Sequence, residues 1–256
     1  MDSPQTGAGA ERPAAAPFDV HLRPEPMVGA VLLASGFARR MGRSKLTLRV
    51  GGRPLLERAL DALVGAERVA RRMVVLQPAD LRLLDRTRYP SVEPIANPLA
   101  AEGQSAAIRL ATEALAADPA IGAIIFCVVD QPFLEPAVLD RLAGAWAGDT
   151  DAILVSQYGG QRGNPVLFGR RYFPELLELR GDVGGREILR VHPDAVREVS
   201  MADPAAGQDV DTWDDLKAAR ARARRRRNRG QPSREEDDGN APRPAAGVTA
   251  GSTTGG

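Results

Sequence analysis

Short apolar runs alternate with longer segments of mixed polarity through the middle of the chain. The apolar runs have the length of buried strands, and they predict strands at residues 28–33, 73–76, 123–129, 152–156 and 165–168. The longer segments predict helices at residues 54–64, 105–117, 136–147, 183–191 and 212–225, and the prolines at 54 and 136 suit first helical turns. Because strands that alternate with helices build parallel sheets covered on both faces, the pattern predicts an α/β fold with a mainly parallel sheet.

The two ends of the chain lack this alternation. Residues 1–26 are rich in Pro, Ala and Gly, and the far end passes from the arginine run "RARARRRRNRG" through "REEDD" to "GVTAGSTTGG". We therefore expect disordered tails at residues 1–26 and 222–256 on either side of one domain at residues 27–221. Because acidic residues follow the arginines closely, a polyampholyte tail is favoured over a tail that binds nucleic acid.

Composition excludes several classes of protein. The 256 residues carry a formal net charge of +1, so the chain has no overall bias toward polyanions or polycations. The one cysteine, Cys127, lies in the apolar run "AIIFCVV" and is predicted to be buried, as expected in a reducing cytosol. No apolar run is long enough to span a bilayer and the first residues lack an apolar signal core, so a cytoplasmic protein without a membrane partner is expected. With two histidines, His-rich metal sites and Ser-His-Asp triads are nearly excluded.

The segment "VLLASGFARRMGRSK" (31–45) places glycines and cations directly after the first predicted strand. Ligands of α/β sheets bind at the carboxyl ends of strands. Gly36 and Gly42 would let backbone N–H groups approach an anion closely, and Arg40 and Lys45 would neutralise phosphate oxygens. The spacing matches neither a Walker A loop nor a dinucleotide fingerprint. A phosphate site is favoured over a glycine turn with solvated cations.

Acidic residues come at the ends of two later segments, "FCVVDQPFLEP" (126–136) and "DVDTWDDL" (209–216). Asp130 ends a buried strand and is expected to point into the same crevice as the glycine loop, where Mg²⁺ is its natural partner. A turn or helix-capping role for Asp130 is the alternative. Asp209 and Asp211 lie on one face of an extended segment and are candidates for a second metal ligand, while Thr212 is expected to cap the next helix.

Two more loops carry candidate binding residues. Gln104 stands just before a predicted helix and Ser105 begins it, a position suited to contact an anion or a base. The segment "GGQRGNPVLF" (159–168) is expected to turn at Gly159-Gly160 and again at residues 162–164, and then to enter a strand. A simple hairpin is the alternative there.

Taken in order, these motifs resemble those of the MobA-like nucleotidyltransferases. "LASGFARRMGRSK" is similar to the family's signature loop, and "EGQS", "VDQP", "RGNPVLF", "RGDVGGREIL" and "DVDTWDDL" follow in the family's order over residues 28–216. The Asp-Gln-Pro, Gly-Asn-Pro and Gly-Asp-x-Gly-Gly elements resemble most closely the molybdenum cofactor cytidylyltransferase branch, the MocA-like enzymes. The resemblance implies a Rossmann-like, three-layer fold of the nucleotide-diphospho-sugar transferase type. It also implies Mg²⁺-dependent transfer of CMP from CTP to molybdopterin, with release of pyrophosphate.

Matching positions imply roles for single residues. The implied catalytic residues are Arg40, Lys45 and Asp130, and the implied Mg²⁺ ligands are Asp130 and Asp211. The residues expected to contact the nucleotide or the acceptor are Leu33, Ala34, Ser35, Gly36, Gly42, Gln104, Ser105 and Asn164, with Arg162 and Gly163 beside Asn164 facing the acceptor. Ser35 stands where cytidylyl enzymes usually have Ala and guanylyl enzymes Gly.

Other functions stay open at this point. The chain could use GTP or another NTP, or attach its nucleotide to a different small phosphate. It could be a non-catalytic carrier that delivers the cofactor to a molybdenum hydroxylase apo-enzyme, although a carrier has no need of Asp130, Asp211 and Lys45. The arginine tail could bind nucleic acid, the least favoured of these functions.

Overall fold

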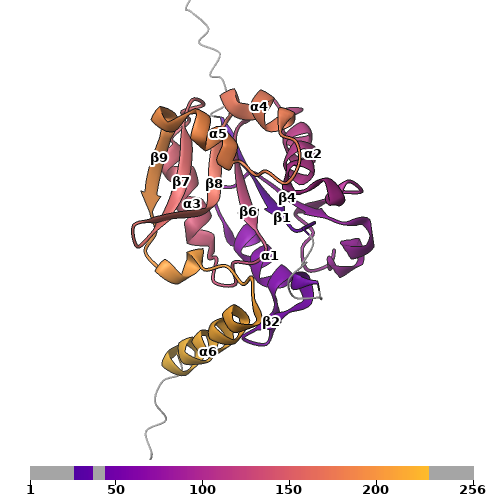
Figure 1. Cartoon of the computed structure of the whole chain (residues 1–256), viewed down its shortest axis with the longest axis vertical. Helices are drawn as coiled ribbons and strands as arrows, with labels where there is room; N and C mark the ends of the chain where they lie inside the picture. Colours follow the sequence, from indigo (N-terminus) through magenta and orange to yellow (C-terminus); the bar gives the residue numbers. More distant parts are fainter. Residues whose placement is uncertain (1–25, 37–43, 231–256) are drawn as a thin grey trace, which may run out of the picture.

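A seven-stranded sheet forms the centre of the molecule (Figure 1). The computed structural model describes residues 26–36 and 44–230. In order across the sheet, the strands are β5 (Val92–Ala96), β4 (Arg71–Leu76), β1 (Met27–Leu33), β6 (Ile121–Val128), β8 (Gln161–Gly169), β7 (Ile153–Tyr158) and β9 (Val196–Ser200). Within this sheet only β8 runs antiparallel to its neighbours, β6 and β7. The prediction of a mainly parallel sheet is therefore confirmed.

Helices cover both faces of the sheet, as the alternating pattern predicted. One face packs against α1 (Leu55–Gly65) and α3 (Pro136–Trp146), and the other against α2 (Gln104–Ala116), α4 (Phe173–Glu178) and α5 (Arg186–Val191). Successive residues of a strand point to opposite faces. In β1, Ala30 and Leu32 accordingly join the core beneath α1, while Val31 and Leu33 join the core beneath α2. The three-layer fold follows from this double-sided burial.

The two central strands, β1 and β6, are apolar because both of their faces are covered. Cys127 of β6 is buried as predicted, and burial raises the pKa of its thiol to about 12. Gly29 of β1 lets α2 approach closely, because a Cβ at this position would lie 2.9 Å from the side chain of Leu115. No helix in the described part of the chain combines the length and the apolar character needed to cross a membrane.

The edges of the sheet differ from the sequence prediction. Strands β5 and β9 were not predicted, because their sequences VEPIA and VREVS are largely exposed and carry no apolar run. The short helix α4 was also missed. The turn at Gly159-Gly160 is confirmed, with φ of 57° and 87°, but the second turn at residues 162–164 is wrong. These residues already belong to β8, and a register shift after Val155 of β7 accommodates the extra length.

The last helix of the described residues, α6 (Trp213–Gly230), continues past residue 222, where the tail is predicted to begin. It leaves the body of the molecule beside a small hairpin of β2 (Arg49–Val50) and β3 (Arg53–Pro54) (Figure 1). Arg220 donates a hydrogen bond from Nε to the carbonyl oxygen of Arg49 at 2.9 Å, which ties the helix to the hairpin. Residues 222–228 thus lie within this helix, and the boundaries of the domain and its tails stay a prediction.

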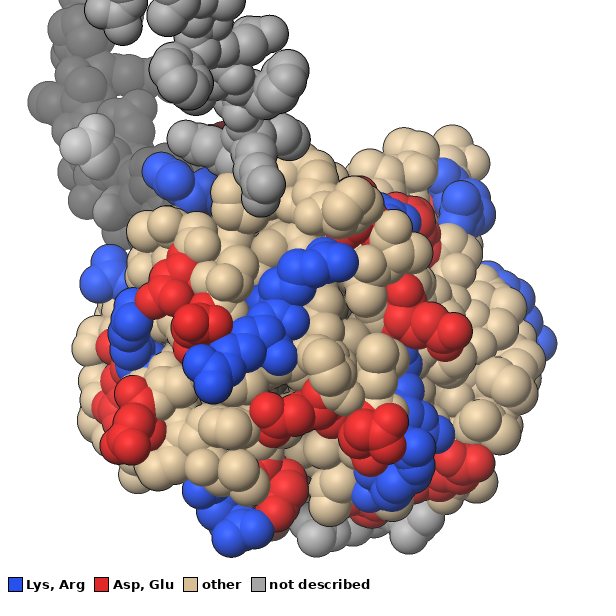
Figure 2. Space-filling view, turned by 90° about the horizontal axis from the view of Figure 1, so that it is seen from above, with Lys and Arg blue, Asp and Glu red and all other residues tan. Residues whose placement is uncertain are grey.

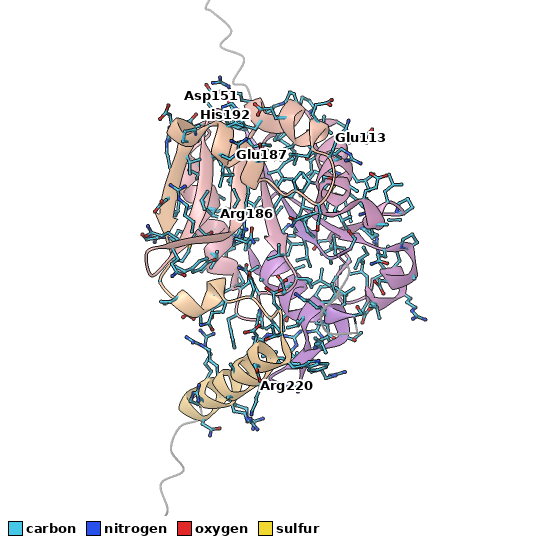
Figure 3. All side chains as sticks on the ribbon, viewed as in Figure 1. Glu113, Asp151, Arg186, Glu187, His192 and Arg220 are labelled. Atoms are coloured by element: carbon cyan, nitrogen blue, oxygen red, sulfur yellow. The ribbon has the colours of Figure 1, made fainter. Side chains whose placement is uncertain are left out.

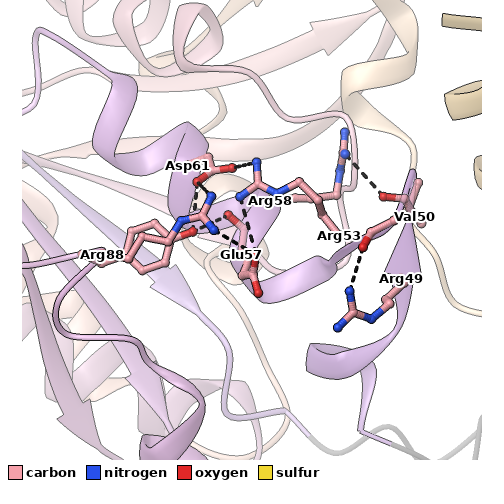
Figure 4. A network of polar contacts seen from close by, with 9 residues as sticks. Arg49, Val50, Arg53, Glu57, Arg58, Asp61 and Arg88 are labelled. Carbon is pink, nitrogen blue, oxygen red and sulfur yellow. Dashed lines mark hydrogen bonds and ion pairs between the residues drawn. The ribbon is translucent and has the colours of Figure 1, made fainter. Parts of the chain in front are cut away.

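A network of ion pairs fastens the same hairpin to α1 (Figure 4). Arg53 pairs with Asp61, and Arg88 reaches both Glu57 at 3.3 Å and Asp61 at 3.5 Å. The hydroxyl of Tyr89 donates to Asp61 Oδ1 at 2.9 Å. Networks of this kind hold their members better than isolated surface pairs do. The hairpin follows directly on the short helix η1 (Lys45–Thr47), so the network also restrains the segment that carries Lys45.

Candidate active site

The backbone after β1 is fixed by side chains from the two neighbouring strand ends. Ser35 is buried, and its Oγ accepts a hydrogen bond from Asn97 Nδ2 at 2.9 Å. Its carbonyl oxygen accepts a second bond from Gln77 Nε2 at 3.1 Å. Gln77 follows β4 and Asn97 follows β5, so three parallel strands end at one level. Neither amide was identified from the sequence, because nothing local links Gln77 or Asn97 to Ser35.

Lys45 lies between two of the predicted metal ligands. Its Nζ donates to Asp130 Oδ2 at 3.0 Å and to Asp211 Oδ1 at 2.7 Å. The side chain of Lys45 is 18% exposed, that of Asp130 23% and that of Asp211 50%. Water therefore screens the attraction between these charges only in part. Burial by itself would lower the pKa of Lys45, but the charge of Asp130 and the hydrogen bonds to both carboxylates raise the pKa above its ordinary value. The structure thus brings together three residues far apart in sequence.

Each member of this cluster is held by its own element. Lys45 opens η1, and the buried side chains of Leu46 and Leu48 anchor that segment in the core beneath α1. Asp130 follows β6, and its carbonyl oxygen accepts a hydrogen bond from Val210 N at 2.9 Å. This bond lays the segment before α6 beside the end of β6. The backbone itself therefore sets the distance between Asp130 and Asp211.

Thr212 caps α6 as predicted and thereby fixes Asp211. Asp215 Oδ2 accepts hydrogen bonds from the backbone N–H of Thr212 at 2.8 Å and of Asp211 at 3.2 Å. The backbone N–H of Asp215 donates in return to Thr212 Oγ1 at 3.2 Å. This reciprocal arrangement is a capping box. The hydroxyl of Thr212 also donates to Asp215 Oδ2 at 2.7 Å, and this bond, followed by those from the backbone N–H groups, lowers the pKa of Asp215, which acts as a structural anion at the helix start.

Two arginines of α6 hold the loop that follows Asp130. The buried ring of Phe133 has Arg226 and Arg222 over it, with the guanidinium carbons 5.0 and 5.7 Å from the ring centre. Arg226 also pairs with Glu135 at 3.1 Å, and both arginines pair with Asp203. Cation–π contacts stabilise such packing when the cation is partly desolvated. Part of the arginine run therefore supports the candidate site. This structural role of the arginines was not predicted from the sequence.

Asp209 was predicted as an alternative to Asp211. Desolvation by surrounding protein atoms, and then the charge of Asp130, raise the pKa of Asp209 to about 6, although part of the side chain is exposed. Among the described residues, Lys45 pairs with two carboxylates, those of Asp130 and Asp211. The geometry thus favours Asp211 over Asp209 as the partner of Asp130.

The donor set fits a divalent cation that shares its coordination with a ligand. Oxygen atoms of Asp130 and Asp211 converge within hydrogen-bond distance of one nitrogen atom. Within residues 26–36 and 44–230, no group of three or more Asp, Glu, His or Cys side chains gathers to enclose a metal. Mg²⁺ typically binds to one or two carboxylates and completes its shell with phosphate oxygens and water. The assignment of Asp130 and Asp211 as metal ligands stays a prediction.

Two adjoining cavities open at this end of the sheet. The first has a volume of about 440 Å³ and is lined by residues that include Ser35, Gly36, Lys45, Gln104, Asp130 and Asp211. The second has a volume of about 690 Å³ and is lined by residues that include Phe126, Arg162, Asn164, Phe168, Val183 and Arg186. Leu33, Gln104, Val128 and Asp182 line both. The two cavities are therefore neighbouring parts of one crevice at the carboxyl ends of β1 and β6.

Not every predicted site residue lines this crevice. Ala34 is buried, and its N–H donates to Val75 O at 3.0 Å within the sheet. Ser105 is fully buried in α2, where its Oγ accepts a hydrogen bond from Arg109 Nη1 at 3.3 Å. The structure thus gives Ser105 a place inside the protein and not at the crevice. Arg40 and Gly42 lie outside the described residues.

A loop at residues 180–185 packs against the start of α2 and lines the crevice where the two cavities meet. Gly103 has a φ of 102°, and a Cβ there would lie 2.5 Å from the Cα of Asp182. A Cβ at Gly184 would lie 2.5 Å from Gln104 Oε1. Gly103 is needed for this close approach, because its neighbour is backbone, whereas a Cβ at Gly184 would meet only the end of a flexible side chain. Gln104 is consequently held under the loop, where both cavities meet.

Comparisons with known proteins agree with the fold. A family model described as "MobA-like NTP transferase domain" matches residues 30–197. The chain is 29% identical to "Nicotine blue oxidoreductase" of Paenarthrobacter nicotinovorans, over 73% of this chain and 93% of that protein. It is also 29% identical to "Purine catabolism protein PucB" of Bacillus subtilis, over 64% and 82% of the two chains. A shorter match, 42% over 52 residues, is to a probable molybdenum cofactor guanylyltransferase of Pyrococcus furiosus, covering 20% of this chain and 26% of that one.

Solved structures show the same architecture. Rv0371c of Mycobacterium tuberculosis superposes with a TM-score of 0.65 at 26% identity, over 77% of this chain and 99% of that one. A second structure of that protein is a complex with manganese, with a TM-score of 0.60 over 76% and 98% of the two chains. A nucleotidyl transferase of Methanothermobacter has a TM-score of 0.65 at 19% identity, over 78% and 99%, and supports the fold alone.

We expect Gly103→Ala to lower the free energy of unfolding more than Gly160→Ala does. Both glycines have positive φ, 102° and 87°, so both substitutions strain the backbone by about 1 kcal/mol. Only at Gly103 does the new Cβ also collide with backbone, and displacing such contacts costs a further 1–3 kcal/mol, roughly. Urea unfolding of the two variants measures the difference. Equal losses would contradict the tight packing of the loop on α2.

Proposed function

We propose a reaction for this chain, which belongs to the MobA-like NTP transferase family. The family match makes it a nucleotidyltransferase related to the enzymes of molybdenum cofactor biosynthesis. In the proposed reaction it transfers CMP from CTP to the terminal phosphate of a molybdopterin-type acceptor and releases pyrophosphate. The observation that carries the proposal is the convergence of Lys45, Asp130 and Asp211 on one cavity at the carboxyl end of the sheet. Such an arrangement suits a metal-bound triphosphate.

The first cavity is assigned to the nucleotide. Lys45 supplies a compact positive charge for the triphosphate, and Arg40, outside the described residues, is assigned the same task by its place in the glycine loop. Gln104 and the backbone at Gly36 are the neighbouring groups for the base and ribose. The volume of about 440 Å³ is within the range of small-molecule sites.

Mg²⁺ is the proposed cofactor, held by Asp130 and Asp211. Its chemistry, when bound, would be to neutralise charge on the α-phosphate and to orient it toward the acceptor. The manganese complex of the Mycobacterium relative supports a divalent cation in this type of fold. The oxygen donors suit Mg²⁺ and Mn²⁺ alike, and Mg²⁺ is proposed because the family resemblance implies it.

The residues perform positioning and charge neutralisation in this reaction. A bond forms between an acceptor phosphate oxygen and the α-phosphorus, and the bond from that phosphorus to the bridging oxygen of the β-phosphate breaks. A phosphate monoester is largely ionised at neutral pH, so the attack requires no general base. In the described part of the chain no histidine lines either cavity. Lys45 would stabilise the leaving pyrophosphate, whose negative charge grows as the bond breaks.

The second cavity is assigned to the acceptor. Arg162 of its lining pairs with Glu198 at 2.6 Å, and Arg190 pairs with Glu187. Arg186, at the start of α5 (Figure 3), has no hydrogen-bond or ion-pair partner among the described residues. Unlike the other two arginines, Arg186 therefore has all its N–H donors available for an anionic acceptor. Apolar side chains such as Phe126 and Phe168 would contact a flat ring system.

GTP is the alternative nucleotide. The short match to a guanylyltransferase favours it, and Ser35 matches neither the Ala usual in cytidylyl enzymes nor the Gly usual in guanylyl enzymes. The name "Nicotine blue oxidoreductase" of one relative suggests redox chemistry. The glycine loop of this chain does not favour that function, because it lacks the glycine spacing of a dinucleotide-binding loop. On the face seen in Figure 2, a short band of basic side chains is flanked on both sides by acidic ones, so the face has mixed charge and not the uniformly basic surface typical of nucleic-acid binding.

The reaction is tested by mixing the purified protein with Mg²⁺, molybdopterin and each NTP separately, and measuring pyrophosphate. We expect release with CTP, because the Asp-Gln-Pro and Gly-Asn-Pro motifs match the cytidylyl branch. Release with GTP only would replace CTP by GTP in the proposal. Absence of release with every NTP would contradict the reaction and favour the carrier.

Asp130→Asn should lower turnover by about 100-fold or more while leaving the fold intact, since it removes a charge that holds the metal and keeps the side-chain shape. Asp194→Asn is the matched control, because Asp194 is exposed and lies outside both cavities. Steady-state rates and circular dichroism measure the two effects. Near-normal turnover of Asp130→Asn would refute the metal assignment.

Arg186→Ala should raise the KM for the acceptor by about tenfold and leave the KM for the nucleotide unchanged, because a charge-assisted hydrogen bond to the acceptor is lost. Arg82→Ala, an exposed arginine on η2 (Pro78–Leu83), is the control. A rise in the nucleotide KM instead would assign the second cavity to the nucleotide.

A further inference from the structure

Lys45 occupies the place where the two proposed metal ligands converge. Its Nζ is 3.0 Å from Asp130 Oδ2 and 2.7 Å from Asp211 Oδ1. The choice of lysine is distinctive here, because Lys45 and Lys217 are the only lysines among the 34 basic residues of the sequence. Arginine presents a broad planar fork, whereas an ammonium group is a compact point charge that fits between two carboxylate oxygens. The ammonium therefore bridges the two carboxylates with one compact charge, as a metal ion held by both would, although its contacts are longer than the roughly 2.1 Å of a Mg²⁺–oxygen bond.

An ammonium ion and a divalent cation cannot share this position. Both would bind the same two oxygen atoms, and they repel each other at such short distances. A free metal ion that enters the site must therefore displace Lys45 from both carboxylates without offering it a new anionic partner. A metal ion that arrives with a triphosphate brings further anionic oxygens, to which the flexible Lys45 side chain can turn. The exchange is then balanced in charge.

We propose that Lys45 is an internal counter-ion that keeps free divalent cations out of the site, so that the site takes its metal as a complex with a nucleoside triphosphate. This inference rests on the proposed function, because it takes Asp130 and Asp211 as the metal ligands and the triphosphate as the anion that draws Lys45 away. It assigns Lys45 a task before the reaction, in addition to its contact with the leaving group. The ammonium also neutralises the repulsion between the two carboxylates that it joins.

The test measures Mn²⁺ binding to the full-length protein in the absence of nucleotide, by electron paramagnetic resonance of free Mn²⁺. Lys45→Met removes the charge and keeps the length of the side chain. We expect it to bind Mn²⁺ about tenfold more tightly than the wild type or better. Lys45→Arg keeps the charge and should bind no more tightly than the wild type. Lys217→Met removes the other lysine, which is exposed on α6, and should leave Mn²⁺ binding unchanged.

Two further measurements make the result specific. Asp130→Asn in the Lys45→Met background should abolish the gain, which locates the ion at the carboxylates. A non-hydrolysable CTP or GTP analogue should tighten Mn²⁺ binding by more than about tenfold in the wild type and by a smaller factor in Lys45→Met, because only the wild type has a lysine to displace. If Lys45→Met is unstable, Lys45→Gln serves as a second neutral variant, with Mn²⁺-dependent thermal shifts as readout.

Equal Mn²⁺ affinity in the wild type and the neutral variants would overturn the inference. Wild-type protein that binds Mn²⁺ as tightly alone as with the nucleotide analogue would also overturn it. Affinities measured without nucleotide do not depend on which base or acceptor the enzyme uses. A failure of nucleotidyl transfer and a failure of this inference are therefore observed in different experiments.

Discussion

The contact of one ammonium group with two carboxylates is the interaction on which the candidate site depends. Asp130 and Asp211 are 81 positions apart in the chain, and a cation between two carboxylates offsets the repulsion of their charges. Lys45 provides that charge from a third segment. The sheet makes the meeting possible, because β1 and β6 are adjacent and parallel and so end at the same edge. The hydrogen bond from Val210 N to Asp130 O then lays the segment with Asp211 alongside.

Helix α6 supports this contact at two places along its length. At its start, the capping box holds the backbone of Asp211 in place. Farther along the helix, the guanidinium groups of Arg222 and Arg226 pack over the ring of Phe133, three residues after Asp130. Asp203 and Glu135 offset the repulsion between these arginines. One helix thereby sets the position of both acidic residues, although the family match ends at residue 197.

Sequence reasoning succeeded where the physical signal is local or strongly apolar. The strands β1 and β6 are buried on both faces, so their apolar runs identify them, and the carboxyl-end rule then brings Lys45 and Asp130 to one crevice. It failed where the determinant is a contact between distant residues. Strands β5 and β9 are exposed edges that owe their structure to pairing with a neighbour. Ser105 has the position of a ligand-binding residue, yet packing of α2 buries it completely.

Ser35 shows how the same limit affects the choice of base. From the sequence its hydroxyl is an uncommitted polar group next to the nucleotide. In the fold, Asn97 is completely buried and uses both ends of its amide, donating to Ser35 Oγ at 2.9 Å and accepting from Leu99 N at 3.0 Å. Rotating Ser35 away would leave a buried N–H without an acceptor, which costs about 1–3 kcal/mol. The hydroxyl is therefore held by the protein, and in the proposed nucleotide site position 35 would act on the base through the backbone and the space that it leaves.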